Sequence, residues 1–260
     1  MSWDISFLFS STGQTITELA RPEFQIGPNN AFLIKEGEPF GIFYGHKVLD
    51  NLADLPAGTD LSTYRINDDG YVVNEDHEPQ FLLDENGNKS QVVIGDINPD
   101  FNLSISSTLN LKKFSAYLLF DIKKGGDVYN QTKQWTYREL LHPEVDQTGK
   151  PEAEKIPAGY YSGLYNINNT TSHFVEDGSY FKFRELNLSY NLTQDLMGET
   201  SFVKNIKFSL IGRNLITISN YSGVDPEVTV LGNGDQTNFM FDGFGYPNFT
   251  TVTGGIEINF

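Results

Sequence analysis

Residues 65–76 place oxygen-bearing side chains at the spacing of a calcium-binding loop. Such loops take ligands from the first, third, fifth and twelfth positions and a glycine from the sixth. Asn67, Asp69 and Asp76 fit ligand positions, and Gly70 fits the sixth. The first position is Arg65, a cation that repels calcium. The pattern therefore predicts either a calcium site at these three side chains or, as the favoured interpretation, an Asp-rich turn with no cofactor.

Other patterns that could support catalysis are weak. The four histidines show neither an HExxH motif nor a paired spacing, so no catalytic zinc site is predicted. No G-x-S-x-G motif and no phosphate-binding glycine loop occur. Asp225 and Glu227 flank Pro226 and could act as an acid and a base, but a structural turn is the favoured interpretation. We expect no enzymatic activity.

Aromatic residues are frequent in the segments between the predicted strands. Such rings can stack on sugar faces or on peptide side chains, but more often they stabilise their own loop. Tyr129 and Trp135 follow a bend expected at Gly125 and Gly126. We therefore predict Tyr129 and Trp135 as the residues that contact a substrate.

The composition favours β structure. The chain of 260 residues has 20 Phe and 13 Tyr but only 3 Met and no Cys, and aromatic side chains suit strands. The absence of cysteine excludes a disulfide framework and thiolate chemistry. A formal net charge of −16 argues against nucleic acid as a partner, because binding to its backbone needs clustered Lys and Arg.

Targeting and membrane signals are sparse. The strongest apolar stretch, residues 116–120, is far shorter than the ~18 residues of a helical membrane span. A strand of a membrane β-barrel shows only about ten residues of alternating hydrophobicity, so the lack of a long apolar stretch does not exclude a membrane β-barrel. The first residues lack a basic region followed by an apolar core, and so predict no secretory signal. We expect either a cytoplasmic protein or a fragment.

Alternating apolar and polar residues predict seven strands. In the last one, Val252, Ile256 and Ile258 alternate with Thr253, Glu257 and Asn259. Two further strands form a hairpin with a tight turn at Lys112 and Lys113. The predicted strands cover residues 3–10, 15–19 with an extension towards 34, 101–111, 114–122, 180–192, 205–218 and 252–260.

Short and long connections alternate along the chain. The short ones are residues 11–14, 112–113 and 193–204, and the long ones are residues 37–99, 125–178 and 219–248. Compact soluble domains rarely contain several loops longer than ~15 residues. Outer-membrane barrels have short periplasmic turns and long extracellular loops. With seven strands, the first and the last both run towards the periplasm, and further strands are expected before Met1 because such barrels have an even number.

A soluble β-sandwich remains an alternative, because its strands alternate in the same way. The distinction depends on the apolar side chains, Leu103, Leu118, Leu188 and Ile256 among them. In a barrel they contact lipid, whereas in a sandwich a second sheet covers them.

Several motifs resemble one family. Residues 176–190 read EDGSYFKFRELNLSY and resemble the EDGSYLRLRNLTLGY segment near the end of SusC/RagA-type TonB-dependent transporters. In the order of that family follow GEPFG at 37–41 with Tyr44 and Gly45, GDINPDF at 95–101, GGDVYN at 125–130, GRNL at 212–215, YSGVDPE at 221–227 and the terminal Phe260. The resemblance covers essentially the whole chain.

The resemblance implies an all-β fold, with residues 1–260 as the C-terminal part of a transmembrane β-barrel that has long extracellular loops and lacks its plug and first strands. It implies a bacterial outer membrane, a SusD-like surface lipoprotein as partner, TonB contact through the missing N-terminal part, and import of glycans or peptides. Phe260 resembles a barrel-assembly signal, or is simply the last residue facing lipid. A carbohydrate-binding β-domain, soluble or on the cell surface, and a porin-like passive channel remain alternatives.

Overall fold

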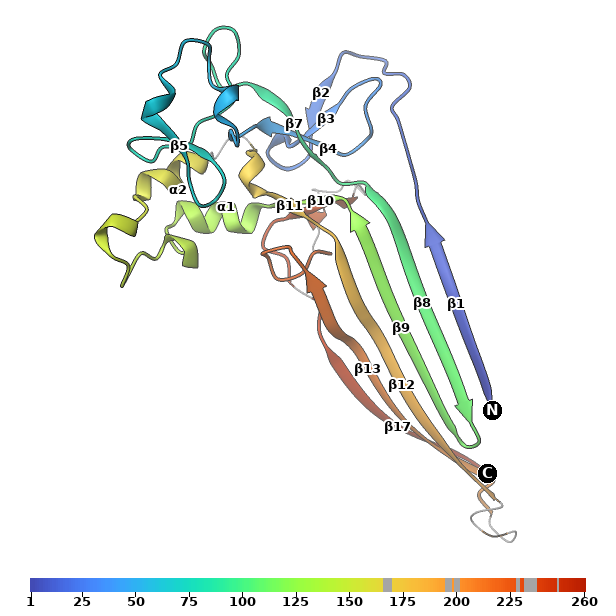
Figure 1. Ribbon diagram of the computed structural model, residues 1–260. Coiled ribbons are helices and arrows are strands. Elements are labelled where there is room, and N and C mark those ends of the chain that lie inside the picture. Colours follow the sequence, from blue (N-terminus) through green and yellow to red (C-terminus); the bar gives the residue numbers. More distant parts are fainter. Residues whose placement is uncertain (166–169, 195–197, 199–201, 228–229, 232–237, 247) are drawn as a thin grey trace.

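The computed structural model describes all residues except 166–169, 195–197, 199–201, 228–229, 232–237 and 247. Among the described residues, six long strands form one antiparallel sheet in the order β1-β8-β9-β12-β13-β17 (Figure 1). These strands are β1 (Ser2–Ser10), β8 (Pro99–Leu111), β9 (Phe114–Gly125), β12 (Tyr180–Thr193), β13 (Asn205–Ser219) and β17 (Thr251–Asn259). Strands β1 and β17 are the two edges of this sheet.

The described residues of the three long segments between these strands, 11–98, 126–179 and 220–250, gather at one end of the sheet and are called the loop cap (Figure 1). Its strands are β2 (Phe24–Ile26), β3 (Phe32–Ile34), β4 (Ile42–His46), β5 (Tyr64–Ile66), β6 (Val72–Asn74), β7 (Gln91–Asp96), β10 (Asp127–Asn130), β11 (Val175–Asp177), β14 (Val230–Leu231), β15 (Asn238–Phe239) and β16 (Phe241–Asp242). Its helices are α1 (Gln131–Arg138) and α2 (Ala158–Leu164), with 3-10 helices at Pro28–Asn30, Leu52–Asp54, Leu61–Thr63, Pro143–Val145, Glu152–Glu154 and Ser172–Phe174.

The predicted strand at residues 15–19 is wrong. These residues form no strand, and the expected extension instead contains β2 and β3, which belong to a separate sheet with β4 and β7. Within residues 15–19 the apolar residues are Ile16 and Leu19, three positions apart, so they cannot share one face of a strand. Residues 11–14 therefore begin a long segment and are not a short turn.

The direction predicted for the first strand is also wrong. In the pairing of β1 with β8, Ser2 faces Asn110 and Ser10 faces Asn102, so β1 runs towards the loop cap. The last strand, β17, runs away from it (Figure 1). With β1 in this direction, the alternation of short and long connections is kept, because all three long segments lie at the same end of the sheet.

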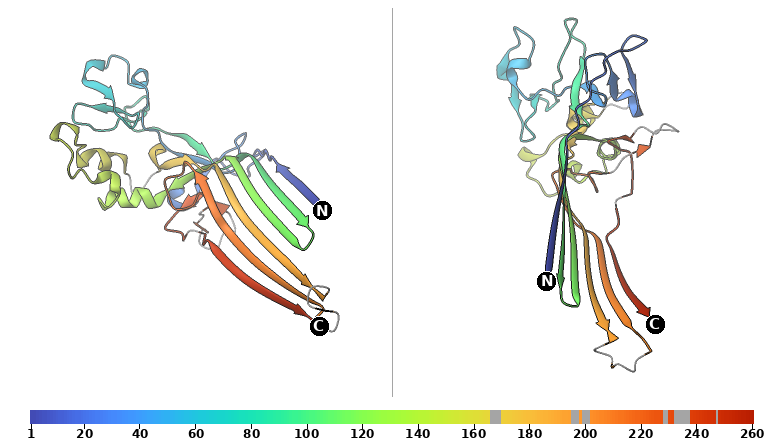
Figure 2. Two further views of the ribbon diagram at one scale, coloured as in Figure 1. Left: turned by 60° about the horizontal axis from the view of Figure 1, so that its bottom comes forward. Right: turned by 90° about the vertical axis from the view of Figure 1, so that its right-hand side faces the viewer.

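The sheet has one apolar and one polar face. The register places on one face Trp3, Phe7, Leu103, Ile105, Leu118, Phe120, Leu186, Leu188, Phe208, Leu210 and Ile256. The other face carries Asp4, Ser6, Ser104, Thr108, Asp121, Asn187, Ser189, Lys207 and Glu257. Leu188 is 42% exposed and Ile256 is 68% exposed. In the described part of the chain no second sheet covers the apolar face, and the edge view in Figure 2 shows a single layer.

The buried core lies in the loop cap and not against the sheet. Its residues come from all three long segments and include Phe32, Phe43, Tyr129, Tyr137, Tyr160, Leu164, Phe174 and Phe241. The cap is thus packed like a small water-soluble domain, whereas the sheet leaves its apolar face open. None of the helices in the described residues is long and apolar enough to cross a membrane.

Candidate functional site

A cluster of opposite charges joins the end of β12 next to the loop cap to the segment 220–250. We call Lys182, Arg184, Asp225 and Glu227 the anchoring cluster. The Nζ atom of Lys182 lies 2.7 Å from Oδ1 of Asp225 and 2.6 Å from Oε2 of Glu227. Lys182 is only 2% exposed. Its charge is therefore balanced by two carboxylates and not by water, as a buried ammonium requires.

Arg184 completes the cluster. Its Nη1 atom donates to Oε2 of Glu227 at 2.7 Å, and its Nη2 atom donates to the other oxygen of the same carboxylate. Its Nε atom donates to Oδ2 of Asp121 on β9 at 2.9 Å. Two adjacent strands and one segment of the loop cap are thus held together by charge-assisted hydrogen bonds, which are stronger than neutral ones.

The carboxylates of Asp225 and Glu227 are not an acid and base pair. Burial by itself raises the pKa of Glu227, but hydrogen bonds from Arg184 and Lys182 outweigh it and lower the pKa to about 2. A carboxylate that stays ionised and is held by cations is a poor proton donor near neutral pH. The structural turn favoured from the sequence is what the geometry shows.

The anchoring cluster makes a pH-dependent contribution to stability. The pKa of Glu227 is depressed from 4.5 to about 2, so the stabilisation is complete above pH 4.5 and is lost as the pH falls towards 2. We expect the protection factors of the backbone amides at residues 220–227, which correct for the intrinsic effect of pH on exchange, to fall over this range. The variant Glu227→Gln should exchange faster at neutral pH and lose the dependence, and an unchanged pH profile in that variant would contradict the assignment.

The bend before α1 is built from two glycines. Gly125 and Gly126 have φ of 75° and 74°, and a Cβ on Gly126 would lie 2.6 Å from the carbonyl oxygen of Ile97. Residues with a side chain rarely adopt a positive φ, so the bend requires glycine at these positions. After the bend, the Asn130 side chain accepts a hydrogen bond from the Lys133 amide at 2.8 Å and caps α1. The bend predicted from the sequence is present.

Of the two predicted substrate-contacting residues, Tyr129 is not available to a substrate in this structure. It is 0% exposed, and its ring stacks on Phe241 with centroids 5.0 Å apart, while Phe43 lies 6.0 Å away. Burial raises its pKa well above the ordinary value, because the ionised phenol would lose its water. The role of Tyr129 is to pack the core of the loop cap.

Trp135 lies on α1 and keeps part of its ring accessible. The guanidinium carbon of Arg138 lies 4.9 Å from the ring centre, and Phe244 packs edge-on with centroids 6.3 Å apart. A substrate contact at Trp135 therefore stays a prediction, whereas Tyr129 is buried.

Alanine variants separate the two aromatic residues. Tyr129→Ala should destabilise the loop cap by about 3–5 kcal/mol, the usual range for a large buried aromatic side chain. Trp135→Ala should leave the stability of the cap nearly unchanged and weaken substrate binding. Thermal unfolding and ligand-binding assays on the purified full-length protein measure the two effects; equal losses of stability in both variants would contradict the distinction.

The predicted calcium ligands are not brought together. Asn67 accepts a hydrogen bond from the Tyr71 amide at 2.8 Å, and Asp69 accepts one from the Tyr160 hydroxyl at 2.5 Å. Asp76 lies beyond β6, at the other end of the β5–β6 hairpin. In the described part of the chain, no three acidic or histidine side chains converge on a point where an ion could bind. The first two side chains instead stabilise a turn and its contact with α2.

A half-buried histidine, which no sequence motif singles out, links two segments of the loop cap. Nδ1 of His173 lies 3.1 Å from the Tyr71 hydroxyl, and Nε2 lies 3.2 Å from the Tyr137 hydroxyl. Burial lowers the pKa of His173 to about 3, so its ring is neutral at physiological pH. Its partners are distant in sequence, so no local spacing could reveal it. We assign it to cap stability.

Phe260 follows β17 and is 62% exposed. Its ring centroid lies 5.5 Å from that of Phe202, close to the lower end of the sheet. A recognition role for the terminal aromatic residue stays a prediction. The predicted short turn at residues 193–204 lies partly outside the described residues.

An antiparallel sheet with one exposed apolar face and all long segments at one end defines the wall of a membrane β-barrel. Comparison with known proteins shows that the chain is similar to TonB-dependent receptors. The chain is 28% identical to TonB-dependent receptor P3 of Formosa agariphila over 236 residues, 88% of this chain and 23% of the receptor. It is 28% identical to TonB-dependent receptor P26 of the same organism over 286 residues, 100% of this chain and 27% of the receptor.

Solved structures agree with the fold. The structure of the RagAB peptide transporter matches 98% of this chain and 27% of the compared chain, with a TM-score of 0.65 and 20% identity. No family model matches the chain. The resemblance to SusC/RagA-type TonB-dependent transporters is confirmed, and so is the fold class of an antiparallel barrel portion with long loops. The chain spans about a quarter of the length of these curated relatives.

Proposed function

We propose that residues 1–260 form the C-terminal portion of a TonB-dependent outer-membrane transporter that imports oligomeric nutrients, either glycans or peptides. The observation that carries the proposal is the apolar face of the sheet, which is open to the surroundings along its length while the core lies in the loop cap. A face of this kind is stable in lipid and unstable in water. The similar proteins are receptors and importers and not enzymes, which supports a function without chemistry in this segment.

The proposed role of this segment is passive. The sheet provides part of the barrel wall, and the loop cap provides part of the extracellular mouth. The proposed partners are a SusD-like surface lipoprotein at the mouth and the TonB complex, which makes contact through parts of the transporter outside this chain. The RagAB structures, described as peptide importers, support the proposal of a surface partner and of an oligomeric substrate.

Uptake by whole cells tests the proposal. Cells that carry the full transporter are given fluorescently labelled oligosaccharides or peptides, with and without an uncoupler of the proton-motive force. The expected result is uptake that stops when the uncoupler is added, with the protein in the outer-membrane fraction. Uptake that continues would favour a porin-like passive channel, and recovery of the protein in the soluble fraction would favour a soluble carbohydrate-binding domain.

We also propose that this segment needs no cofactor, and that calcium is not required by the turn at residues 67–70. Asn67 and Asp69 are already engaged in hydrogen bonds within the cap. Addition of EGTA should therefore leave the thermal unfolding temperature of the full transporter and that of its Asp69→Asn variant unchanged. A decrease in the wild type that the variant does not show would establish a calcium site at this turn.

A further inference from the structure

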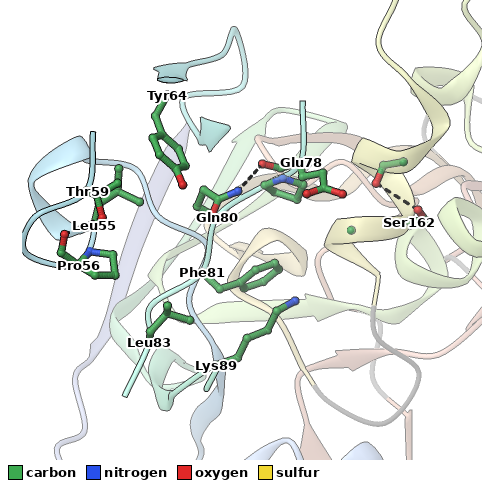
Figure 3. A pocket seen from close by; sticks show the side chains of 13 residues that line it. Leu55, Pro56, Thr59, Tyr64, Glu78, Gln80, Phe81, Leu83, Lys89 and Ser162 are labelled. Atoms are coloured by element: carbon green, nitrogen blue, oxygen red, sulfur yellow. Dashed lines mark hydrogen bonds between the residues drawn. The ribbon is translucent and has the colours of Figure 1, made fainter. Parts of the chain in front are cut away.

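A pocket of about 540 Å³ opens in the loop cap between residues 55–89 and α2 (Figure 3). Its volume is within the range of about 300–1,000 Å³ that is usual for small-ligand sites. Leu55, Pro56 and Leu83 provide apolar walls, the largely buried Phe81 lies at the base, and Gly159, Ser162 and Gly163 of α2 line the opposite side. We call it the Phe81 pocket.

One cation in the Phe81 pocket has no ionic partner. The Nζ atom of Lys89 lies 3.7 Å from the centre of the Phe81 ring, and among the described residues no carboxylate forms an ion pair with it. Elsewhere in the cap, Lys35 pairs with Glu23 at 3.4 Å and Lys47 pairs with Asp50 at 3.7 Å. Partial loss of water lowers the pKa of Lys89. Lys89 is exposed, so an anionic ligand in the pocket would accept a charge-assisted hydrogen bond from its ammonium group.

Glu78 also lines this pocket, and among the described residues no cation forms an ion pair with its carboxylate. Glu78 is exposed, and its Oε2 atom accepts a hydrogen bond from the side-chain amide of Asn74 at 3.0 Å. In Figure 3 the ring of Phe81 lies between Glu78 and Lys89. The pocket therefore presents a positive and a negative group on either side of an aromatic surface, with neither group neutralised by the other.

The surrounding charge restricts the class of ligand. Residues 11–98, which form most of this pocket, contain 15 Asp and Glu against 5 Lys and Arg. A polyanionic glycan would be repelled by this surface and by Glu78. A neutral glycan would leave Lys89 without an ionic partner. A short peptide has a single terminal carboxylate for Lys89, amino or basic groups for Glu78, and apolar side chains for the walls.

We propose that the Phe81 pocket binds the carboxylate end of a short peptide through Lys89, with Leu55 and Leu83 contacting the last side chain and Glu78 attracting its positive groups. This inference rests on the proposed import function and deepens it, because it selects peptides over glycans. It also places an initial binding step at the outer surface of the loop cap, away from the barrel wall.

Binding of defined peptides to the purified full transporter tests the proposal. The probes are a pool of synthetic tripeptides with free carboxylate ends and the same pool with amidated ends, with bound peptides quantified by mass spectrometry. We expect amidation to reduce binding about tenfold or more, as loss of a charge-assisted contact does. Lys89→Met, which keeps the apolar stem over Phe81, should bind both pools equally and weakly, and Lys89→Arg should retain the preference for the free carboxylate.

The matched control is Lys35→Met, which removes an exposed lysine of the same segment that already has an acidic partner. It should bind the two pools as the wild type does. Equal binding of free and amidated peptides by the wild type would overturn the proposal, and so would an unchanged preference in Lys89→Met. If the wild type binds neither pool but imports oligosaccharides in an uncoupler-sensitive way, the pocket assignment fails while the proposed function stands.

Discussion

Arginine in place of Leu186 should prevent the sheet from reaching its folded state in a lipid bilayer. Leu186 lies on the apolar face, in the middle of β12, where it pairs with Leu118 on one side and Gly212 on the other. A cation on the lipid side of a barrel strand costs about 2–4 kcal/mol near the bilayer midplane. The measurement is folding of the full-length protein into lipid vesicles, followed by the shift in electrophoretic mobility between the folded and the heated protein.

The neighbouring residue provides the control. Asn187 lies one position further along β12, and its side chain points to the polar face, where it pairs with Tyr117 and Ile211. Because successive side chains of a strand alternate between faces, Asn187→Arg adds the same group on the other side of the same sheet. We expect Asn187→Arg to fold nearly as the wild type does. Equal damage from both variants would mean that the two faces do not meet different surroundings.

Lys182→Met should release the segment 220–250 from the sheet. The substitution leaves Asp225, which is 5% exposed, and Glu227 without one of their cations. Removal of one partner from a buried ion pair costs about 3–5 kcal/mol, because the remaining charge stays buried without compensation. The expected result is faster hydrogen exchange at residues 220–227 and a lower unfolding midpoint. The proposed import function would then decline because the segment is displaced.

Two further variants show whether charge is the reason. Lys207→Met removes a lysine from the polar face of β13 that has no ion pair within the described residues, and it should have little effect. The double variant Lys182→Met with Asp225→Asn removes both charges and should recover much of the lost protection. If the double variant is as unstable as the single one, packing of the lysine side chain and not its charge holds the segment.

The strands of the sheet could be predicted from the sequence because their patterns are long. Strands β8, β9, β12, β13 and β17 each show the period-two pattern over at least nine residues, and the structure places them within a few residues of the prediction. The segment at residues 15–19 shows too short a pattern, and tertiary packing assigned its neighbourhood to another sheet. The predicted direction of each strand depended on counting the strands that follow it. Because the predicted strand at residues 15–19 does not exist, the predicted direction of β1 was reversed as well.

The contacts of the loop cap could not be predicted in the same way. Tyr129 packs against Phe43, Phe174 and Phe241, which come from three different segments of the chain. Nothing in the residues beside Tyr129 shows that these rings meet, so the local sequence could not reveal that Tyr129 is buried. The partners of Asp225 and Glu227 lie about 43 residues away on β12, beyond the reach of local spacing.

The parallel pairing of β10 with β16 bears on how the molecule is assembled. Tyr129 pairs with Phe241, and the Tyr129 amide donates to the Met240 carbonyl at 2.9 Å, across more than one hundred residues of chain. Contacts between such distant residues form late, since the intervening chain must first be confined. Strands β12 and β13 perform that confinement, because they bring both segments to one rim. The loop cap should therefore complete its packing only after the sheet has formed. If formation of the sheet stops midway, the aromatic side chains of the loop cap stay exposed to the barrel-assembly machinery.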